Sequence, residues 1–116
     1  MAESATTRRI DSHHSMYPSL LGEIPHPPEN LYITGTLVEK DLLAVALVGS
    51  RRPSEYGRRM SRMLSRDLAA RGVTIVSGLA RGIDAEAHLA AIQAAGRTVA
   101  VLGCGIDVDY PRGTEE

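Results

Sequence analysis

The amino-acid sequence predicts an α/β protein with a parallel sheet, in the order β-α-β-α-β, preceded by a short N-terminal extension. Three apolar segments have the length of buried strands: residues 42–48, 73–76 and 98–102. The segments between them repeat their apolar residues at helical spacing, and a loop of small residues follows each strand. This order implies a parallel sheet, and we expect its crossovers to be right-handed.

Length and composition indicate one domain with a modest core. The chain has 116 residues, of which 43% are hydrophobic, and it contains no Phe or Trp. No apolar run approaches the length of a membrane span, and the N-terminus lacks the apolar stretch of a signal peptide. The single cysteine, Cys104, cannot form an internal disulfide. We therefore expect a cytoplasmic protein that does not bind membranes.

The predicted organisation begins with an arm. Residues 1–16 are polar and lack periodicity, so we expect them to be disordered, with the domain spanning residues 17–116. Four prolines in residues 17–28 exclude a long helix, and residues 31–35 are expected to form a short strand. The seven apolar residues of 42–48 indicate a strand buried on both faces.

Helix boundaries follow from caps and spacing. The first helix is expected to begin after Ser54 as N-cap and to end at Arg71, with Gly72 just beyond. Its large apolar side chains share one face, which we expect to be buried: Tyr56, Met60, Met63, Leu64 and Leu68. The second helix is expected over about residues 85–95, with Asp84 as N-cap.

The loops after the predicted strands should share one edge of the sheet, where ligands bind in open α/β folds. These loops contain Gly49–Ser50, Ser77–Gly78 and Gly103–Gly105. Four arginines should converge there: Arg51, Arg52, Arg81 and Arg112. A buried strand, a small-residue turn and a helix start at Gly49–Ser50 favour a phosphate site.

Charge is unevenly distributed along the chain. The net charge is −1, yet residues 51–81 contain eight arginines and two acids. Such a segment is either an electropositive face for a polyanion or a solvated, arginine-rich helix face.

Motifs for nucleotide cofactors and metals are absent from the sequence. No G-x-G-x-x-G or G-x-x-x-x-G-K-[ST] pattern occurs, and the only lysine is Lys40. His13 and His14 are adjacent but have no further ligand at metal-binding spacing. We expect neither a cofactor nor a metal.

A hydrolytic site could draw on residues near the loops, namely Ser50, Ser77, Asp84, Glu86 and His88. However, neither serine sits in a G-x-S-x-G elbow. Helix packing or capping therefore explains His88 and Asp84 better than catalysis.

Three motifs resemble the DNA processing protein A family, also called DprA or Smf. They are V-G-S-R-R-x-S-x-Y-G at 48–57, V-S-G-L-A-R-G-I-D-x-x-A-H at 76–88 and V-L-G-x-G-I-D-x-x-Y-P at 101–111. The resemblance extends from about Tyr17 to Pro111 and implies a Rossmann-like, three-layer parallel α/β fold. The family's later F-P-x-R-N-R stretch is not found here, so the chain resembles the first half of that domain.

The resemblance also implies a function. Such proteins bind and protect single-stranded DNA without enzymatic activity during natural transformation, help to load the recombinase RecA, and typically act as homodimers. The family's glycine-serine-arginine motif falls on Gly49, Ser50 and Arg51, and Arg112 lies where the family tends to place another DNA contact.

These inferences lead to one mechanism and one alternative. Phosphates would bind backbone N–H groups of the Gly49–Ser50 and Ser77–Gly78 loops, with charge from Arg51 and Arg112, and secondarily from Arg52 and Arg81. Recognition would be weakly sequence-specific. The alternative is a nucleotide phosphoribohydrolase of the lysine-decarboxylase-like family, whose P-G-G-x-G-T-x-x-E signature is absent here.

Overall fold

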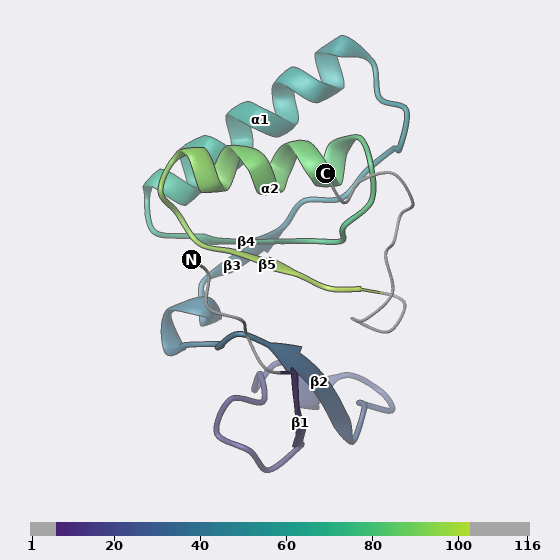
Figure 1. The fold of residues 1–116 in the computed structure, drawn as a ribbon, viewed down its shortest axis with the longest axis vertical. Helices are drawn as coiled ribbons and strands as arrows, with labels where there is room; N and C mark the ends of the chain where they lie inside the picture. The colour runs from purple at the N-terminus through teal and green to yellow at the C-terminus, as the bar shows by residue number, and fades with distance from the viewer. Residues whose placement is uncertain (1–6, 103–116) are drawn as a thin grey trace. The chain divides into compact units, whose positions relative to one another are not determined.

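The computed structural model describes residues 7–102 of the chain (Figure 1). The chain divides into two compact units, residues 1–42 and 43–116. The first contains the strands β1 (Thr7–Asp11) and β2 (Asn30–Thr34) and the short 3-10 helices η1 (Leu21–Glu23) and η2 (Glu39–Leu42). The second contains β3 (Ala44–Ala46), α1 (Glu55–Ala70), β4 (Thr74–Ser77), α2 (Ile83–Gln93) and β5 (Thr98–Ala100).

The expectation of a disordered arm over residues 1–16 is wrong for residues 7–16. β1 pairs antiparallel with β2, as expected for a strand near residues 31–35, and Ile10 lies opposite Leu31. Ile10 is only 3% exposed, so a single apolar side chain anchors an otherwise polar strand. A turn follows β1, in which the backbone N–H of His14 donates to the carbonyl of Asp11. The paired residues are 19 to 27 positions apart in the sequence, a contact that local periodicity does not reveal.

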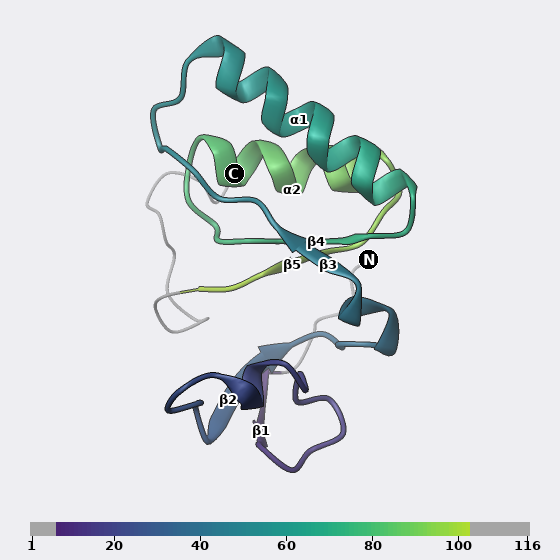
Figure 2. The same ribbon diagram turned by 180° about the vertical axis from the view of Figure 1, so that it is seen from behind.

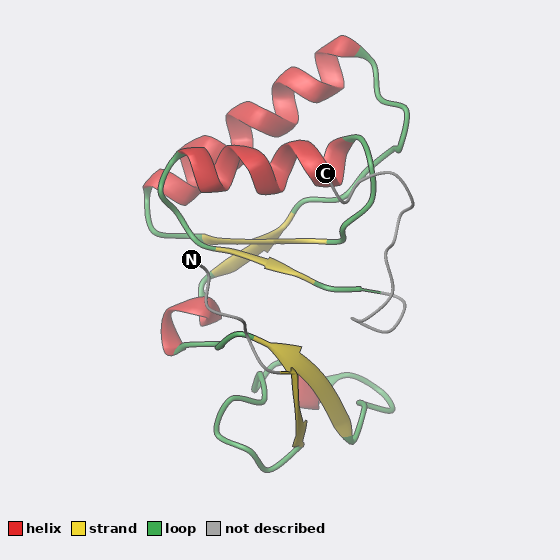
Figure 3. Cartoon of the chain, viewed as in Figure 1, coloured by secondary structure: helices red, strands yellow, loops and turns green. Residues whose placement is uncertain are grey.

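The second unit contains the predicted parallel sheet, with strand order β3-β4-β5. Val45 lies opposite Ile75 in the first pair, and Ile75 lies opposite Thr98 in the second. Helices α1 and α2 cover the same face of this sheet, as the two opposite views in Figures 1 and 2 show. Figure 3 shows the same arrangement with helices in red and strands in yellow. Residues 43–102 therefore supply two of the three layers expected for a Rossmann-like fold.

The expected burial of residues 42–48 on both faces is wrong. Only Ala44–Ala46 form a strand, with Val45 half-buried and both alanines exposed. Val48 is 69% exposed. The cause is topology: among the strands of residues 43–102, β3 lies at an edge and both helices pack on one face, so of these strands only the central β4 is enclosed.

The caps of α1 agree with the sequence-based prediction. Ser54 is the N-cap, and its side chain accepts a hydrogen bond from the N–H of Gly57 at 3.1 Å. At the other end Arg71 is the C-cap, and Gly72 has a φ of +89°. Glycine adopts this conformation at little cost, which ends the helix there.

The buried face of α1, by contrast, is not the predicted apolar stripe. The buried residues are Ser61, Ser65 and Ala69, spaced four apart. Their small size brings α1 close to α2: the hydroxyls of Ser61 and Ser65 donate to backbone carbonyls of α2, at 3.0 and 2.5 Å. Tyr56, Met63 and Leu64 of the stripe remain exposed.

Helix α2 begins two residues earlier than predicted, and its N-cap is Gly82 instead of Asp84. The core between the helices and the sheet is formed by Ala69 of α1, Ile75 of β4, and Ala87 and Ala91 of α2. Within residues 7–102, no helix has the length and apolar character needed to cross a membrane.

Candidate functional site

The candidate site lies at the carboxyl edge of the parallel sheet. There the segment after β3 (the first loop, residues 47–54) meets the segment after β4 (the second loop, residues 78–82). The N–H of Ile83, at the start of α2, donates to the carbonyl of Ser50 at 3.1 Å. The expected convergence of these two loops is therefore present.

The backbones of the two loops also approach each other closely at Gly82. Gly82 has a φ of +81°, and a Cβ placed on it would lie 2.3 Å from the carbonyl oxygen of Ser50 and 2.9 Å from Cα of Arg51. Only glycine fits there. Since Arg81 immediately precedes Gly82, the backbones that carry Arg51 and Arg81 come from adjoining segments.

Asp84 holds both loops with one buried carboxylate. The residue is 6% exposed. Its Oδ1 accepts a hydrogen bond from the N–H of Gly49 at 3.2 Å, and its Oδ2 accepts one from the N–H of Gly78 at 3.1 Å. The interpretation of Asp84 as an N-cap is therefore wrong, and its carboxylate instead holds the two glycine loops together.

This contact changes the expected mode of anion binding. The amides of Gly49 and Gly78 were expected to bind phosphate, but both already donate to Asp84. A buried negative charge beside them also disfavours an anion at that point. Side chains of the loops must therefore supply most of any attraction for phosphate.

The two predicted serines differ in accessibility. Ser50 is exposed, and its hydroxyl oxygen accepts a hydrogen bond from the N–H of Arg52 at 2.9 Å. Ser77 is 2% exposed, and its hydroxyl donates to the carbonyl of Leu47. Ser77 thus joins β4 to the first loop from inside, whereas Ser50 faces solvent.

His88 supports the second loop from helix α2. Its Nε2 lies 2.6 Å from the carbonyl oxygen of Gly78, and its Nδ1 lies 2.6 Å from the hydroxyl of Thr98 on β5. A carbonyl only accepts, so Nε2 carries a proton in this arrangement. The packing role expected for His88 agrees with these contacts.

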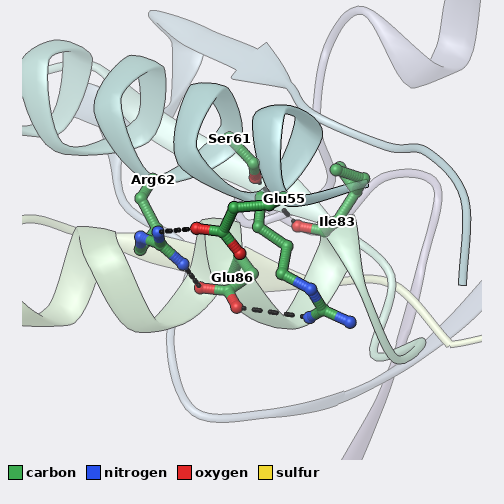
Figure 4. Close-up of polar contacts among 6 residues, drawn as sticks. Glu55, Ser61, Arg62, Ile83 and Glu86 are labelled. Atoms are coloured by element: carbon green, nitrogen blue, oxygen red, sulfur yellow. Dashed lines mark hydrogen bonds and ion pairs between the residues drawn. The ribbon is translucent and has the colours of Figure 1, made fainter. Parts of the chain in front are cut away.

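Six of the eight arginines of residues 51–81 fall into two groups, while Arg59 lies over the ring of Tyr56 and Arg71 is the C-cap of α1. Three on α1 are paired with acids: Arg58 and Arg62 with Glu86 of α2, at 3.5 and 3.2 Å, and Arg66 with Asp67, at 3.8 Å. Figure 4 shows Glu86 between the two helices, with Glu55 also reaching Arg62. For this part of the helix, the structure favours the interpretation as a solvated, ion-paired face.

The arginines of the two loops form the second group. Arg51, Arg52 and Arg81 are all exposed, at the edge where Asp84 and Gly82 bring the loops together. Arg112 and the predicted loop at Gly103–Gly105 lie outside the described residues. The cationic part of the candidate site, within residues 7–102, is therefore built from the loops.

Two features of this site were missed from the sequence. Glu86 lies five residues beyond the arginine-rich segment, so counting charge by segment overlooked its contacts across the helices. Tyr56 was assigned to a buried face but is exposed next to the first loop. Its position in the first turn of α1, directly after the arginine loop, is the signal that could have identified it.

Comparisons with a family profile, with related sequences and with solved structures agree with one another. The profile of the family described as DNA recombination-mediator protein A matches residues 8–116. Protein Smf of Synechocystis sp. is 48% identical over 99 residues, covering 82% of this chain and 25% of that protein.

Two solved structures are similar in both fold and sequence. DNA processing protein A from Streptococcus pneumoniae has a TM-score of 0.83 and 36% identity, over 94% of this chain and 38% of that one. DNA processing protein A from Helicobacter pylori, whose structure describes a single-stranded DNA binding mode, has a TM-score of 0.73 and 33% identity, over 89% and 49%. The chain thus spans between a quarter and a half of the proteins compared here. With matching motifs, a matching fold and a family profile along nearly its whole length, the chain belongs to the DNA recombination-mediator protein A family.

Proposed function

We propose that this chain carries part of a single-stranded DNA site and binds the strand through its phosphates, with little dependence on base sequence. The observation that carries the proposal is the joining of the first and second loops by Asp84 and Gly82, which brings exposed arginines to one edge of the sheet. The residues we propose for this site, as phosphate contacts or as supports of the loops, lie in the two loops, at the end of β4 and after β5: Gly49, Ser50, Arg51, Arg52, Ser77, Gly78, Arg81 and Arg112.

Within this set the residues have different roles. Arg51 and Arg52 supply charge, because a guanidinium can donate two parallel hydrogen bonds to one phosphate. Gly49, Gly78 and Ser77 shape the loops through the contacts with Asp84 and Leu47. Ser50 is the accessible hydroxyl, and Arg81 and Arg112 extend the cationic surface.

Membership of this family supports the part of the proposal that concerns the role of the whole protein. Because the family is described as a DNA recombination mediator, we include in the proposal that the whole protein protects single strands in DNA uptake and delivers them to the recombinase RecA. We include homodimer formation and a cytoplasmic location in the proposal for the whole protein. The single-stranded DNA binding mode described for the Helicobacter pylori protein supports the choice of ligand.

Binding without catalysis fits the site better than the phosphoribohydrolase alternative. The side chains that could act in hydrolysis already contact the protein: Ser77 donates to Leu47, Asp84 accepts from two amides, and His88 contacts Gly78 and Thr98. Each of these contacts holds a loop or strand in place.

The test is fluorescence anisotropy of labelled oligo-dT with the full chain, titrated at several salt concentrations. We expect affinity to fall linearly with salt on logarithmic axes, and duplex DNA to bind less tightly. Arg51→Ala and Arg52→Ala should each weaken binding to every sequence and reduce the salt slope by roughly 0.7 for each phosphate that is no longer neutralised.

Arg71→Ala is the matched control. It removes the same charge from the opposite end of α1, a helix of 16 residues and thus about 24 Å long. That distance exceeds the Debye length of about 8 Å at physiological salt, so binding should change little. The proposal is contradicted if the loop variants bind like Arg71→Ala, or if the folded chain does not bind the oligonucleotide.

A further inference from the structure

Tyr56 is an exposed aromatic side chain beside the arginines of the candidate site. It is the second residue of α1, two residues after the N-cap Ser54 and four after Arg52. Four residues of chain span at most about 14 Å, so the tyrosine and the arginine lie within reach of one short stretch of nucleic acid. Tyr56 is nevertheless 64% exposed.

The exposure of Tyr56 follows from the packing of α1. The helix contacts α2 through Ser61, Ser65 and Ala69. Ser65 is nine residues from Tyr56, which is about two and a half turns, so the two side chains point to opposite sides of the helix. Tyr56 therefore points away from the face of α1 that packs on α2, so within residues 7–102 that contact does not account for an aromatic residue there.

Arg59 holds the ring from one turn further along the helix. Its guanidinium carbon lies over the ring of Tyr56, 5.9 Å from the centroid. Such a contact is a cation–π interaction, in which the positive charge lies against the negative face of the aromatic ring. With this contact in place most of the tyrosine still faces solvent, so the ring is both oriented and accessible.

We propose that Tyr56, oriented by Arg59, is a base-stacking site for the single strand whose phosphates contact Arg51 and Arg52. This inference rests on the proposed function and adds the bases to what the site recognises. Every nucleobase has a π-face, so stacking on Tyr56 adds affinity for single strands without reading their sequence. A duplex keeps its bases stacked inside, which favours single-stranded over double-stranded DNA at this position.

The experiment compares Tyr56→Leu and Tyr56→Phe for binding to labelled oligo-dT and to an abasic strand of equal length. Tyr56→Leu should weaken oligo-dT binding by roughly 5- to 150-fold, the range for losing one base–aromatic stack. Tyr56→Phe keeps the ring and should retain most of the affinity. The salt slope should be unchanged in both variants, because stacking releases no counterions. On the abasic strand, wild type and Tyr56→Leu should bind equally.

Tyr32→Leu is the matched control, because Tyr32 is 63% exposed but lies on β2, outside the two loops. Equal losses in Tyr32→Leu and Tyr56→Leu, or a loss that persists on the abasic strand, would overturn the assignment. So would wild-type affinity of Tyr56→Leu for oligo-dT. In that last case, a reduced salt slope in Arg51→Ala would show that the phosphate site stands and only the stacking proposal fails. Absence of binding by the wild-type chain would overturn both.

Discussion

The replacement Asp84→Asn tests the contact that shapes the candidate site. The carboxylate is 6% exposed and accepts hydrogen bonds from the amides of Gly49 and Gly78. An asparagine keeps one acceptor oxygen but turns an NH2 group toward the other amide, so at least one of the two bonds is lost. The bond that remains is no longer assisted by a negative charge.

The size of the effect follows from these two changes. A hydrogen bond to a charged group contributes about 1.5–3 kcal/mol, and giving the remaining bond a neutral acceptor in place of a charged one costs roughly 1 kcal/mol more. We therefore expect Asp84→Asn to lower the free energy of unfolding by about 2–4 kcal/mol. For a domain of this size, that corresponds to a decrease in Tm of roughly 8–30 °C. Total stabilities are typically about 5–15 kcal/mol, so the variant should remain folded at low temperature.

The assay is urea denaturation of the full chain, followed by far-ultraviolet circular dichroism and by tyrosine fluorescence. Coincident transitions establish two-state unfolding and allow the free energies to be compared. Asp67→Asn is the control, because the Asp67 carboxylate is 63% exposed and lies 3.8 Å from Arg66. An exposed pair of this kind contributes at most about 1 kcal/mol. The reasoning is refuted if Asp84→Asn destabilises the chain no more than Asp67→Asn does.

Two further replacements test the packing that places the site, again by urea denaturation. Gly82→Ala should cost more than about 3 kcal/mol, because its Cβ would lie 2.3 Å from the carbonyl oxygen of Ser50. Gly72→Ala, also at positive φ but with nothing within 4 Å of the added Cβ, should cost only about 1–2 kcal/mol, and equal costs would contradict the close approach. Ser65→Val should destabilise by about 1–3 kcal/mol through overpacking against α2, whereas Leu64→Ser should cost less than about 1 kcal/mol. A reversed order for this second pair would show that the apolar stripe, not the small-residue face, is buried.

Much of the fold could be predicted because its signals are local. Ser54 and Gly72 mark the two ends of α1 through side-chain capping and a positive φ, which depend only on neighbouring residues. The parallel order of the sheet follows from alternating strands and helices. The resemblance to the DprA family was likewise carried by contiguous motifs, and the family profile confirms it.

Burial was predicted poorly because it depends on contacts between distant segments. Large apolar residues at helical spacing indicated the wrong face of α1, since serines and alanine allow a closer approach to α2 than leucines do. Similarly, β1 pairs through its backbone and buries only Ile10, which leaves no periodic signal. Small residues at four-residue spacing, such as Ser61, Ser65 and Ala69, are the pattern that would have identified the helix contact.

The candidate site depends both on local sequence signals and on contacts between distant segments. The distant contacts determine how an anion can be bound. The glycine loops were recognisable from the sequence, but the partner of their amides, Asp84, lies 35 residues from Gly49 along the chain. A carboxylate that satisfies those amides keeps the loops rigid and also occupies the donors that a phosphate would use. In the proposed site the loops therefore act as a support, and the attraction would come from the side chains at their surface, Arg51 and Arg52. Because in the proposed site that attraction comes from exposed, charged side chains instead of a backbone cradle, it suits a long polyanion whose phosphates present many equivalent contacts better than it suits one small phosphorylated ligand.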